Sequence, residues 1–236
     1  KALVPRGLCR AFARPGVNVA PNKAQNISKS SLVCAAPDGT TAEIGRAQWV
    51  QALAARVTPE PAMNPVLLKP GTDRRSHVVL MGHPAGEVSS TDWETGRRHL
   101  ATAAHAAYDD VAARFDVIVA EGAGSPAEIN LRAGDYVNLG LARHADLPTV
   151  VVGDSDSGGV FAAMYGTVAL LEPADQRLVA GYVVNKFRGD QTLLSPGLAS
   201  LERLTGRRIH GGLPWEPSPW PDAADPPDLG GPPCPA

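Results

Sequence analysis

The chain has 236 residues, enough to bury one sizeable core, and its formal net charge of −2 gives no basic field for nucleic acid or an anionic membrane. No apolar run approaches the roughly 18 residues that predict a membrane-spanning helix, and no signal-peptide pattern is found near the start. The three cysteines have no metal-ligand spacing, and their odd number argues against a disulfide framework, so a reducing cytoplasm is the expected compartment.

Apolar, β-branched runs alternate with helical patterns along the chain. In chain order the patterns predict a helix at 3–14, a strand at 17–20, a helix at 42–56, a strand at 78–81, a helix at 93–114, strands at 116–120 and 149–153, a helix at 161–171, a strand at 182–184, a helix at 193–205 and a weak strand near Ile209. Continuous apolar strands are typical of parallel sheets covered on both faces. The expected fold is therefore α/β: a doubly wound, mostly parallel sheet with helices on both faces.

Proline dominates the chain from residue 216 onward, and no hydrophobic period survives there. Elsewhere glycine and proline punctuate the periodic segments and form no low-complexity tract. We therefore expect residues 1–215 to form one domain and residues 216–236 to be a flexible or linker-like tail.

Polar or glycine residues follow nearly every predicted strand. The carboxyl ends of parallel strands meet at one edge of an open α/β sheet, and ligands bind at that edge. Several polar strand ends in one fold therefore predict a ligand cleft, although loops are polar in any protein. The polar side chains that follow the strands at 17–20, 149–153 and 182–184 are Asn22, Lys23, Gln25, Asn26, Asp154, Ser155, Asp156, Asn185, Lys186 and Arg188.

The segment DVIVAEGAGSPAEINL, residues 116–131, is the most informative part of the chain. Its apolar run ends in Glu121, and a GAGS turn follows directly. A side-chain-poor turn lets phosphate oxygens approach backbone N–H groups, and an acid beside a phosphate usually implies Mg²⁺. A strand-end acid that caps a turn is an equally good interpretation of this segment alone. The other polar strand ends favour the ligand site.

Six segments of the chain occur in an order typical of one family. They are KAQNIS at 23–28, EIGRAQ at 43–48, MNPVLLKP at 63–70, EGAGSPAEINLR at 121–132, VVNKFRGD at 183–190 and GGLPW at 211–215. Together, over about residues 7–222, they resemble the cobyric acid synthases. The resemblance implies membership of the dethiobiotin-synthetase-like amidoligases, which are P-loop NTPase-like. In that family ATP activates peripheral carboxylates of a corrinoid, and ammonia from glutamine converts them to amides.

The resemblance implies conversion of cobyrinic acid a,c-diamide to cobyric acid in cobalamin biosynthesis, with ATP and Mg²⁺ as cofactors. A carboxylate is a poor acyl donor because hydroxide is a poor leaving group. Transfer of a γ-phosphoryl group gives an acyl phosphate, which ammonia can displace. Such a step needs positioning and charge neutralisation more than covalent catalysis by the protein.

The resemblance also implies a metal site and a nucleotide site. Glu121 and Glu43 are the candidate Mg²⁺ ligands, although Glu43 is equally well interpreted as an ordinary acid in the first turn of a helix. Asn185 is expected to read the adenine edge, with a strand-end cap as the alternative. Lys186 and Pro214 are expected in the same nucleotide site, with a simple turn as the alternative for the proline.

Donor side chains suit the phosphate and the acidic substrate. Lys23 and Ser125, together with Glu121, are expected to act at the reacting groups, and a serine triad is not expected because no histidine has a recognisable triad arrangement. Polar turns and a solvated surface are the alternatives for these donors. The expected substrate ligands are Gln25, Asn26, Asn64, Lys69 and Arg188.

The sequence departs from the family pattern in three ways. The glycine-rich P-loop and the first strand of the sheet are missing: only Lys1 matches the GK[ST] end, and Ala2 follows in place of a Mg²⁺-binding hydroxyl. The family's glutaminase domain, which would supply the ammonia, is not in this sequence. Ser155 and Ser157 replace an apolar residue and an arginine in the loop at 153–161, which is expected to loosen that turn.

Three hypotheses are open at this point. The leading one is the ATP-dependent synthetase domain of a cobyric acid synthase, with a corrinoid polycarboxylate and a glutaminase domain as partners. The second is a related amidoligase such as cobyrinic acid a,c-diamide synthase, against which the KAQN and EIGRAQ segments argue. The third is a non-catalytic remnant that acts only as a binding module, which the missing P-loop supports. The oligomeric state, including a homodimer, stays open.

Overall fold

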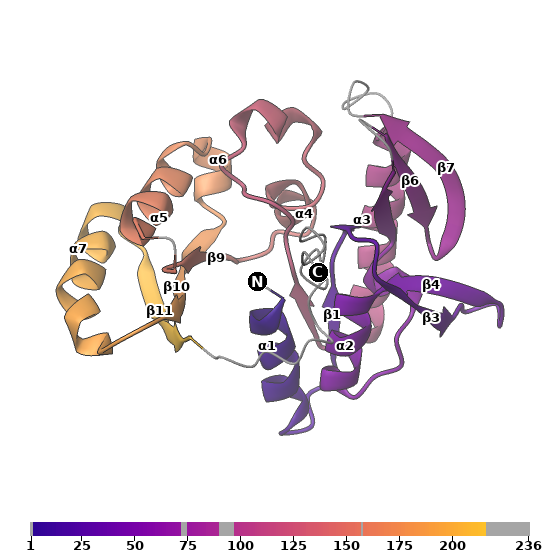
Figure 1. Cartoon of the computed structure of the whole chain (residues 1–236), viewed down its shortest axis with the longest axis horizontal. Helices are drawn as coiled ribbons and strands as arrows, with labels where there is room; N and C mark the ends of the chain where they lie inside the picture. Colours follow the sequence, from indigo (N-terminus) through magenta and orange to yellow (C-terminus); the bar gives the residue numbers. More distant parts are fainter. Residues whose placement is uncertain (1, 72–74, 90–96, 157, 216–236) are drawn as a thin grey trace, which may run out of the picture. The chain divides into compact units, whose positions relative to one another are not determined.

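In a computed structural model of the protein, the described residues are 2–71, 75–89, 97–156 and 158–215 (Figure 1). They divide into two compact units, the first ending at Glu121 and the second beginning at Gly122. Each unit has its own hydrophobic core and its own paired strands. The expected tail at 216–236 lies outside the described residues, and the expectation of one domain over residues 1–215 stays a prediction.

The first unit combines helices with parallel and antiparallel strand pairs. β1 and β8 pair in parallel, while β3 and β4 form an antiparallel hairpin. β2 pairs in parallel with β5, which continues into an antiparallel sheet with β6 and β7. The elements are α1 (Leu3–Ala13), β1 (Val19–Asn22), β2 (Gln25–Ile27), β3 (Ser31–Ala35), β4 (Thr41–Gly45), α2 (Arg46–Ala55), η1 (Pro61–Met63), β5 (Val66–Pro70), β6 (Arg75–Leu80), β7 (His83–Ser89), α3 (Arg98–Arg114) and β8 (Val117–Ala120).

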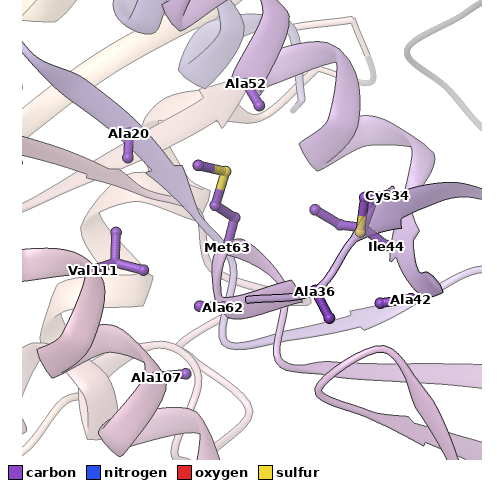
Figure 2. Packing of buried hydrophobic residues seen from close by; sticks show 10 residues of the cluster. All are labelled: Ala20, Cys34, Ala36, Ala42, Ile44, Ala52, Ala62, Met63, Ala107 and Val111. Carbon is purple, nitrogen blue, oxygen red and sulfur yellow. The ribbon is translucent and has the colours of Figure 1, made fainter. Parts of the chain in front are cut away.

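A cluster of mostly small side chains around Met63 forms one hydrophobic core of the first unit (Figure 2). Met63 of η1 is 1% exposed, and Ile44 of β4 is fully buried. Ala52 of α2 and Val111 of α3 belong to the same cluster. Alanines at many of the remaining positions let the elements approach closely, and the flexible methionine fills the space between them. This packing holds α2 against β1.

The second unit is built on a parallel sheet. The nine-residue β10 lies between β9 and β11, and both pairings are parallel. Tyr182 and Val184 of β10 are fully buried, and Met164 of α5 and Leu201 of α7 pack in the same cluster. The elements are η2 (Ile129–Gly134), α4 (Leu139–His144), β9 (Thr149–Asp154), α5 (Val160–Ala169), α6 (Pro173–Gln176), β10 (Val179–Phe187), η3 (Gln191–Leu194), α7 (Ser195–Thr205) and β11 (Arg208–Pro214).

The predicted α/β class with mostly parallel strands is confirmed. The β1–β8, β2–β5, β9–β10 and β10–β11 pairs are parallel, and helices accompany the strands in both units. The predicted strand at 116–120 corresponds to β8, the one at 149–153 to β9, and the weak strand near Ile209 to β11. A central strand of a parallel sheet is buried on both faces, which explains the continuous apolar run of β10.

Two predicted elements of the first unit are wrong in part. The helix predicted at 42–56 begins only at Arg46, because residues 41–45 form β4 and pair with β3. Glu43 therefore lies in a strand, so the reading of Glu43 as a first-turn helix acid is wrong. The strand predicted at 78–81 is confirmed as the end of β6, but the expectation of parallel neighbours is wrong for it, because β5 and β7 both run antiparallel to β6.

Replacing Met63 with alanine tests the importance of this core. The change removes a buried side chain between several elements, so we expect Met63→Ala to lower the free energy of unfolding by about 2–5 kcal/mol. Val33→Ala is the control, because Val33 is 69% exposed on β3 and its loss is expected to cost no more than about 0.5 kcal/mol. Urea unfolding followed by circular dichroism measures both. Equal unfolding midpoints for the two variants would contradict this account of the core.

Candidate functional site

Glu121 lies directly after β8 and is held from two sides. Its backbone N–H donates to the Asn22 carbonyl at 2.7 Å, which continues the pairing of β8 with β1. The side chain is 8% exposed. Oε1 lies 3.3 Å from Nζ of Lys23, and Oε2 accepts a hydrogen bond from Nε2 of Gln51 at 2.9 Å. The acid is thus buried with one cation and one amide donor as partners.

Asn64 organises the backbone around Lys23. Its Nδ2 donates to the carbonyls of Lys23 and Val66 at 3.0 and 3.1 Å, and its Oδ1 accepts from the Gly45 N–H at 3.2 Å. The side chain is 1% exposed. One amide therefore ties together the chain after β1, the start of α2 and the start of β5. This geometry brings the KAQN, EIGRAQ and MNP segments into contact.

A second amide pair completes this polar cluster. Nδ2 of Asn26 donates to Oε1 of Gln48 at 3.2 Å, and both side chains are buried. A Cβ on Gly45 would come within 2.7 Å of the Asn26 and Asn64 side chains, so the close approach requires glycine at this position. Gln25, on β2, is 4% exposed. The substrate roles expected for these amides stay predictions, while their observed bonds hold the loop that carries Lys23.

Glu43 and Lys69 form a separate ion pair in the first unit. The Glu43 carboxylate on β4 accepts hydrogen bonds from the Lys69 ammonium on β5 and from the Ser31 hydroxyl on β3. Burial raises the pKa of Glu43, but the ammonium and the hydroxyl outweigh burial, so the net shift is downward. Glu43 stays ionised with a lysine as its partner. Its role as a magnesium ligand stays a prediction.

The glycine turn after Glu121 is fixed by one asparagine. Nδ2 of Asn138 donates to the Ala123 carbonyl at 2.8 Å, and the Ala123 N–H donates to Oδ1 of Asn138 at 3.0 Å. A Cβ on Gly122 would lie 2.2 Å from Oδ1 of Asn138. The small residue at 122 therefore accommodates Asn138, and the Ala123 N–H is engaged within the protein. The hydroxyl oxygen of Ser125 accepts from the Ala127 N–H at 3.2 Å.

Asp135 orders the chain just before α4. Its Oδ1 accepts from the N–H groups of Val137 and Asn138, and its Oδ2 accepts from the Gly140 N–H, at 2.8–3.1 Å. Capping by an acid satisfies the unpaired donors at a helix start. Asp135 thereby fixes the backbone that presents Asn138. An acid shortly before a helix is a recognisable capping signal, so the sequence could have indicated this residue.

Asp175 is a fully buried acid between two arginines. Arg132 forks onto both carboxylate oxygens at 2.6 and 2.7 Å, and Nε of Arg143 lies 2.5 Å from Oδ1. Burial raises the pKa of Asp175, but the two guanidinium groups outweigh burial and hold it below its usual range. The pairs tie η2 and α4 to α6. No local sequence signal indicates this long-range contact.

Polar side chains gather at the ends of β9 and β10. Asn185 is 7% exposed, and its carbonyl accepts from both the N–H and the hydroxyl of Ser155 at 3.0 and 2.9 Å. Lys186 lies 2.8 Å from Asp154, and the Lys186 ammonium and the Asp156 amide hold the pKa of Asp154 below its usual range. Ser155 was expected to loosen this turn. Instead, its two hydrogen bonds to the Asn185 carbonyl hold the turn against the end of β10. Ser157 lies outside the described residues.

The end of β11 lies beside the same strand end. Phe187 is opposite Pro214, and the Trp215 N–H donates to the Phe187 carbonyl at 2.9 Å. The Arg188 guanidinium lies 4.1 Å from the centre of the Trp215 ring and 3.1 Å from Asp156. The structure thus brings together the four candidates Asn185, Lys186, Arg188 and Pro214 within the second unit.

Lys1, the last of the candidates, lies outside the described residues, so its role in the nucleotide site stays a prediction. Among the described residues, no three His, Cys, Asp or Glu side chains are grouped so that they could hold a metal ion. No helix in the described part of the chain is both long and apolar enough to cross a membrane.

The comparison with known families decides the affiliation of the chain. Residues 1–220 match the family CbiA, described as the CobQ/CobB/MinD/ParA nucleotide binding domain. The chain belongs to this family. The match confirms the predicted P-loop NTPase-like fold and supports binding of a nucleotide.

Curated relatives confirm the resemblance to the cobyric acid synthases. Over 231 residues, the chain is 73% identical to the cobyric acid synthase of Mycolicibacterium gilvum, 74% identical to that of Mycolicibacterium vanbaalenii and 71% identical to that of Mycobacterium tuberculosis. Each match covers 98% of this chain and 47% of the relative. The chain therefore spans about half the length of the curated relatives it matches.

A double-mutant cycle tests whether Asn138 explains the need for glycine at 122. Gly122→Ala places a methyl group against Oδ1 of Asn138, and Asn138→Ala removes two hydrogen bonds, so both single variants are expected to be less stable. The double variant removes the clash, so its loss of unfolding free energy should be smaller than the sum of the two single losses by about 1–3 kcal/mol. Unfolding free energies of the four proteins measure the coupling. Additive losses would show that the two residues act independently.

The pKa of Asp175 predicts a pH dependence of stability. The ionised carboxylate binds the arginines only in the folded state, so its contribution is complete above the unfolded pKa of about 3.9 and is lost as the pH falls toward the lower folded pKa. Asp175→Asn should lower the free energy of unfolding by about 3 kcal/mol at pH 7. Urea unfolding from about pH 7 down to pH 2 should show this difference narrowing below about pH 4. A constant difference would contradict the assignment.

Proposed function

We propose that this chain is the ATP-dependent synthetase part of a cobyric acid synthase. It would amidate side-chain carboxylates of a corrinoid, converting cobyrinic acid a,c-diamide to cobyric acid in cobalamin biosynthesis. The observation that carries the proposal is the buried Glu121 carboxylate at the end of β8, paired with Lys23, in a chain of a nucleotide-binding family. The relatives are named cobyric acid synthase, which favours this activity over that of the related cobyrinic acid a,c-diamide synthase.

The proposed reaction has two steps. A substrate carboxylate oxygen attacks the γ-phosphorus of ATP, the bond to the β,γ-bridging oxygen breaks, and ADP leaves with that electron pair. Ammonia then attacks the acyl phosphate, phosphate leaves, and the nitrogen loses a proton to give the amide. Negative charge accumulates on phosphoryl oxygens in the first step, so cationic and hydrogen-bond donors are the groups that the protein must supply.

Glu121 suits a magnesium ion that accompanies ATP. Mg²⁺ prefers oxygen ligands and is commonly bound by one or two carboxylates together with phosphate oxygens and water. Each Glu121 oxygen accepts one donor and keeps a further lone pair, so the carboxylate can still contribute a ligand. The bound ion would neutralise phosphate charge. Glu43 is proposed as a second acid for the metal, although Lys69 already balances its charge.

Lys23 is the proposed cation at the reacting groups. Its side chain is 12% exposed, and Glu121 is its ion-pair partner. An ammonium group in a poorly solvated position stabilises phosphoryl charge more strongly than one in water. Asn64 fixes the Lys23 carbonyl and thereby the loop that carries this cation. Ser125 is proposed as a hydroxyl donor to a phosphate oxygen.

The remaining candidates are assigned to the nucleotide and to the substrate. The buried Asn185 is proposed to read the adenine edge, and its neighbours at the ends of β10 and β11 support a base site there. The half-buried Lys69 and the exposed Arg188 carry cations that suit the carboxylates of an acidic macrocycle. The nucleotide ligands proposed are Lys1, Asn185, Lys186 and Pro214, and the substrate ligands are Gln25, Asn26, Asn64, Lys69 and Arg188.

Ammonia is proposed to come from glutamine, released by a glutaminase domain of the longer protein. The support is that the curated relatives, all named cobyric acid synthase, are about twice as long as this chain. A cytoplasmic location follows from the proposed biosynthetic role, and a homodimer is one arrangement of the whole protein to be tested.

Glu121→Gln in the full-length protein tests the proposal. The change is nearly isosteric but removes the charge that would bind the metal, so we expect corrinoid amidation to fall at least about 100-fold. Amide formation is followed by mass spectrometry in the presence of ATP, Mg²⁺ and glutamine, and folding by thermal melting. Glu87→Gln, an exposed acid on β7, is the matched control and should keep full activity. Undiminished amidation by the Glu121 variant would refute the role of this acid.

A further inference from the structure

Gln51 is a buried amide with an unusual set of partners. It lies on the inner face of α2 and is 1% exposed. Its Nε2 donates to Oε2 of Glu121 at 2.9 Å and to the Ala2 carbonyl at 3.3 Å. Its Oε1 is buried and has no hydrogen-bond partner in the described structure. A buried amide with an unpaired oxygen is costly, so the bond to Glu121 is the evident compensation for its presence.

The acid determines how this amide is oriented. A carboxylate oxygen only accepts hydrogen bonds, so Gln51 must turn its NH₂ group toward Glu121 and its oxygen away. The opposite orientation would place two acceptors against each other. Lys23 contacts the other carboxylate oxygen from the loop after β1. The plane of the Glu121 carboxylate is therefore set by two donors from different parts of the fold.

Gln48 provides an internal comparison on the same helix. It lies three residues before Gln51, so the two side chains share one helix face, and both are buried. Gln48 accepts a hydrogen bond from Asn26, and its own Nε2 is also buried without a partner among the described residues. Each glutamine thus buries one polar atom without a partner, so the free-energy cost of burying them is similar, but only Gln51 donates a hydrogen bond to Glu121.

We propose that Gln51 is a positioning residue for the metal-binding acid. This inference rests on the proposed function. Hydrogen bonds to the ligands of a metal fix their rotamers, and their loss typically costs about 10–100-fold in metal affinity or activity. Gln51 holds the Glu121 carboxylate in one orientation and leaves the second lone pair of each oxygen available. Gln51 itself touches neither the ion nor the substrate in this account.

Gln51→Met in the full-length protein tests the inference, because methionine keeps the length of the side chain and removes the donor. With ATP present and no corrinoid, Mg²⁺ is titrated and the rise in melting temperature is followed. We expect the Mg²⁺ concentration for half of this rise to increase about 10-fold. Gln48→Met is the matched control: it loses a buried amide on the same helix face but no hydrogen bond to the acid, so its midpoint should shift much less than that of Gln51→Met. The KM for the corrinoid should be unchanged in the Gln51 variant.

Two outcomes would overturn the inference. One is a wild-type Mg²⁺ midpoint in Gln51→Met, and the other is an equal shift in both glutamine variants, which would indicate a structural role of the helix face. If Gln51→Met does not fold, Gln51→Leu gives the same test with a different shape. An inactive Glu121→Gln together with an unshifted Gln51→Met would overturn only the positioning role. Undiminished amidation by Glu121→Gln would overturn the metal-binding role of this acid, on which the inference rests.

Discussion

The buried carboxylate of Glu121 is the constraint around which the first unit is organised. A charge removed from water is costly unless a partner charge and hydrogen bonds compensate for it. Lys23 supplies the charge and Gln51 the hydrogen bond. These partners come from the loop after β1 and from α2, so both must lie against the end of β8. The packing of α2 around Met63 and Ala52 is therefore also what keeps the acid paired.

Buried amides explain why separate sequence segments behave as one unit. Asn64 bonds the backbone of three segments, and Asn26 bonds Gln48 across two of them. Side chains of this kind specify position because each donor and acceptor has a fixed geometry. Asn26 and Asn64, which are proposed to contact the substrate, also hold the backbone beside Lys23. Contact with a ligand and support of a ligand-binding loop are different tasks that the same residue types perform.

The sequence was sufficient for the class of fold and for the position of Glu121. Long apolar runs such as that of β10 identify central strands whatever their neighbours are. The sequence alone does not predict a segment whose local pattern favours one structure and whose distant partners favour another. Residues 41–45 continue smoothly into a helical pattern, yet their pairing with β3 makes them a strand. The ion pairs of Asp175 and the bond from Gln51 to Glu121 are contacts between distant elements, which no local pattern encodes. The glycine turn predicts a small residue at position 122. No sequence pattern identifies Asn138 as the neighbour that requires it.

The paired hydrogen bonds between Ala123 and Asn138 have a consequence for how the segment between them can vary in length. A single amide fastens both ends of the segment 124–137, so this segment behaves as a closed ring. The entropy of closing such a ring grows only slowly with its length. Insertions or exchanges inside the ring are therefore expected to cost little stability as long as the two hydrogen bonds that join its ends are kept.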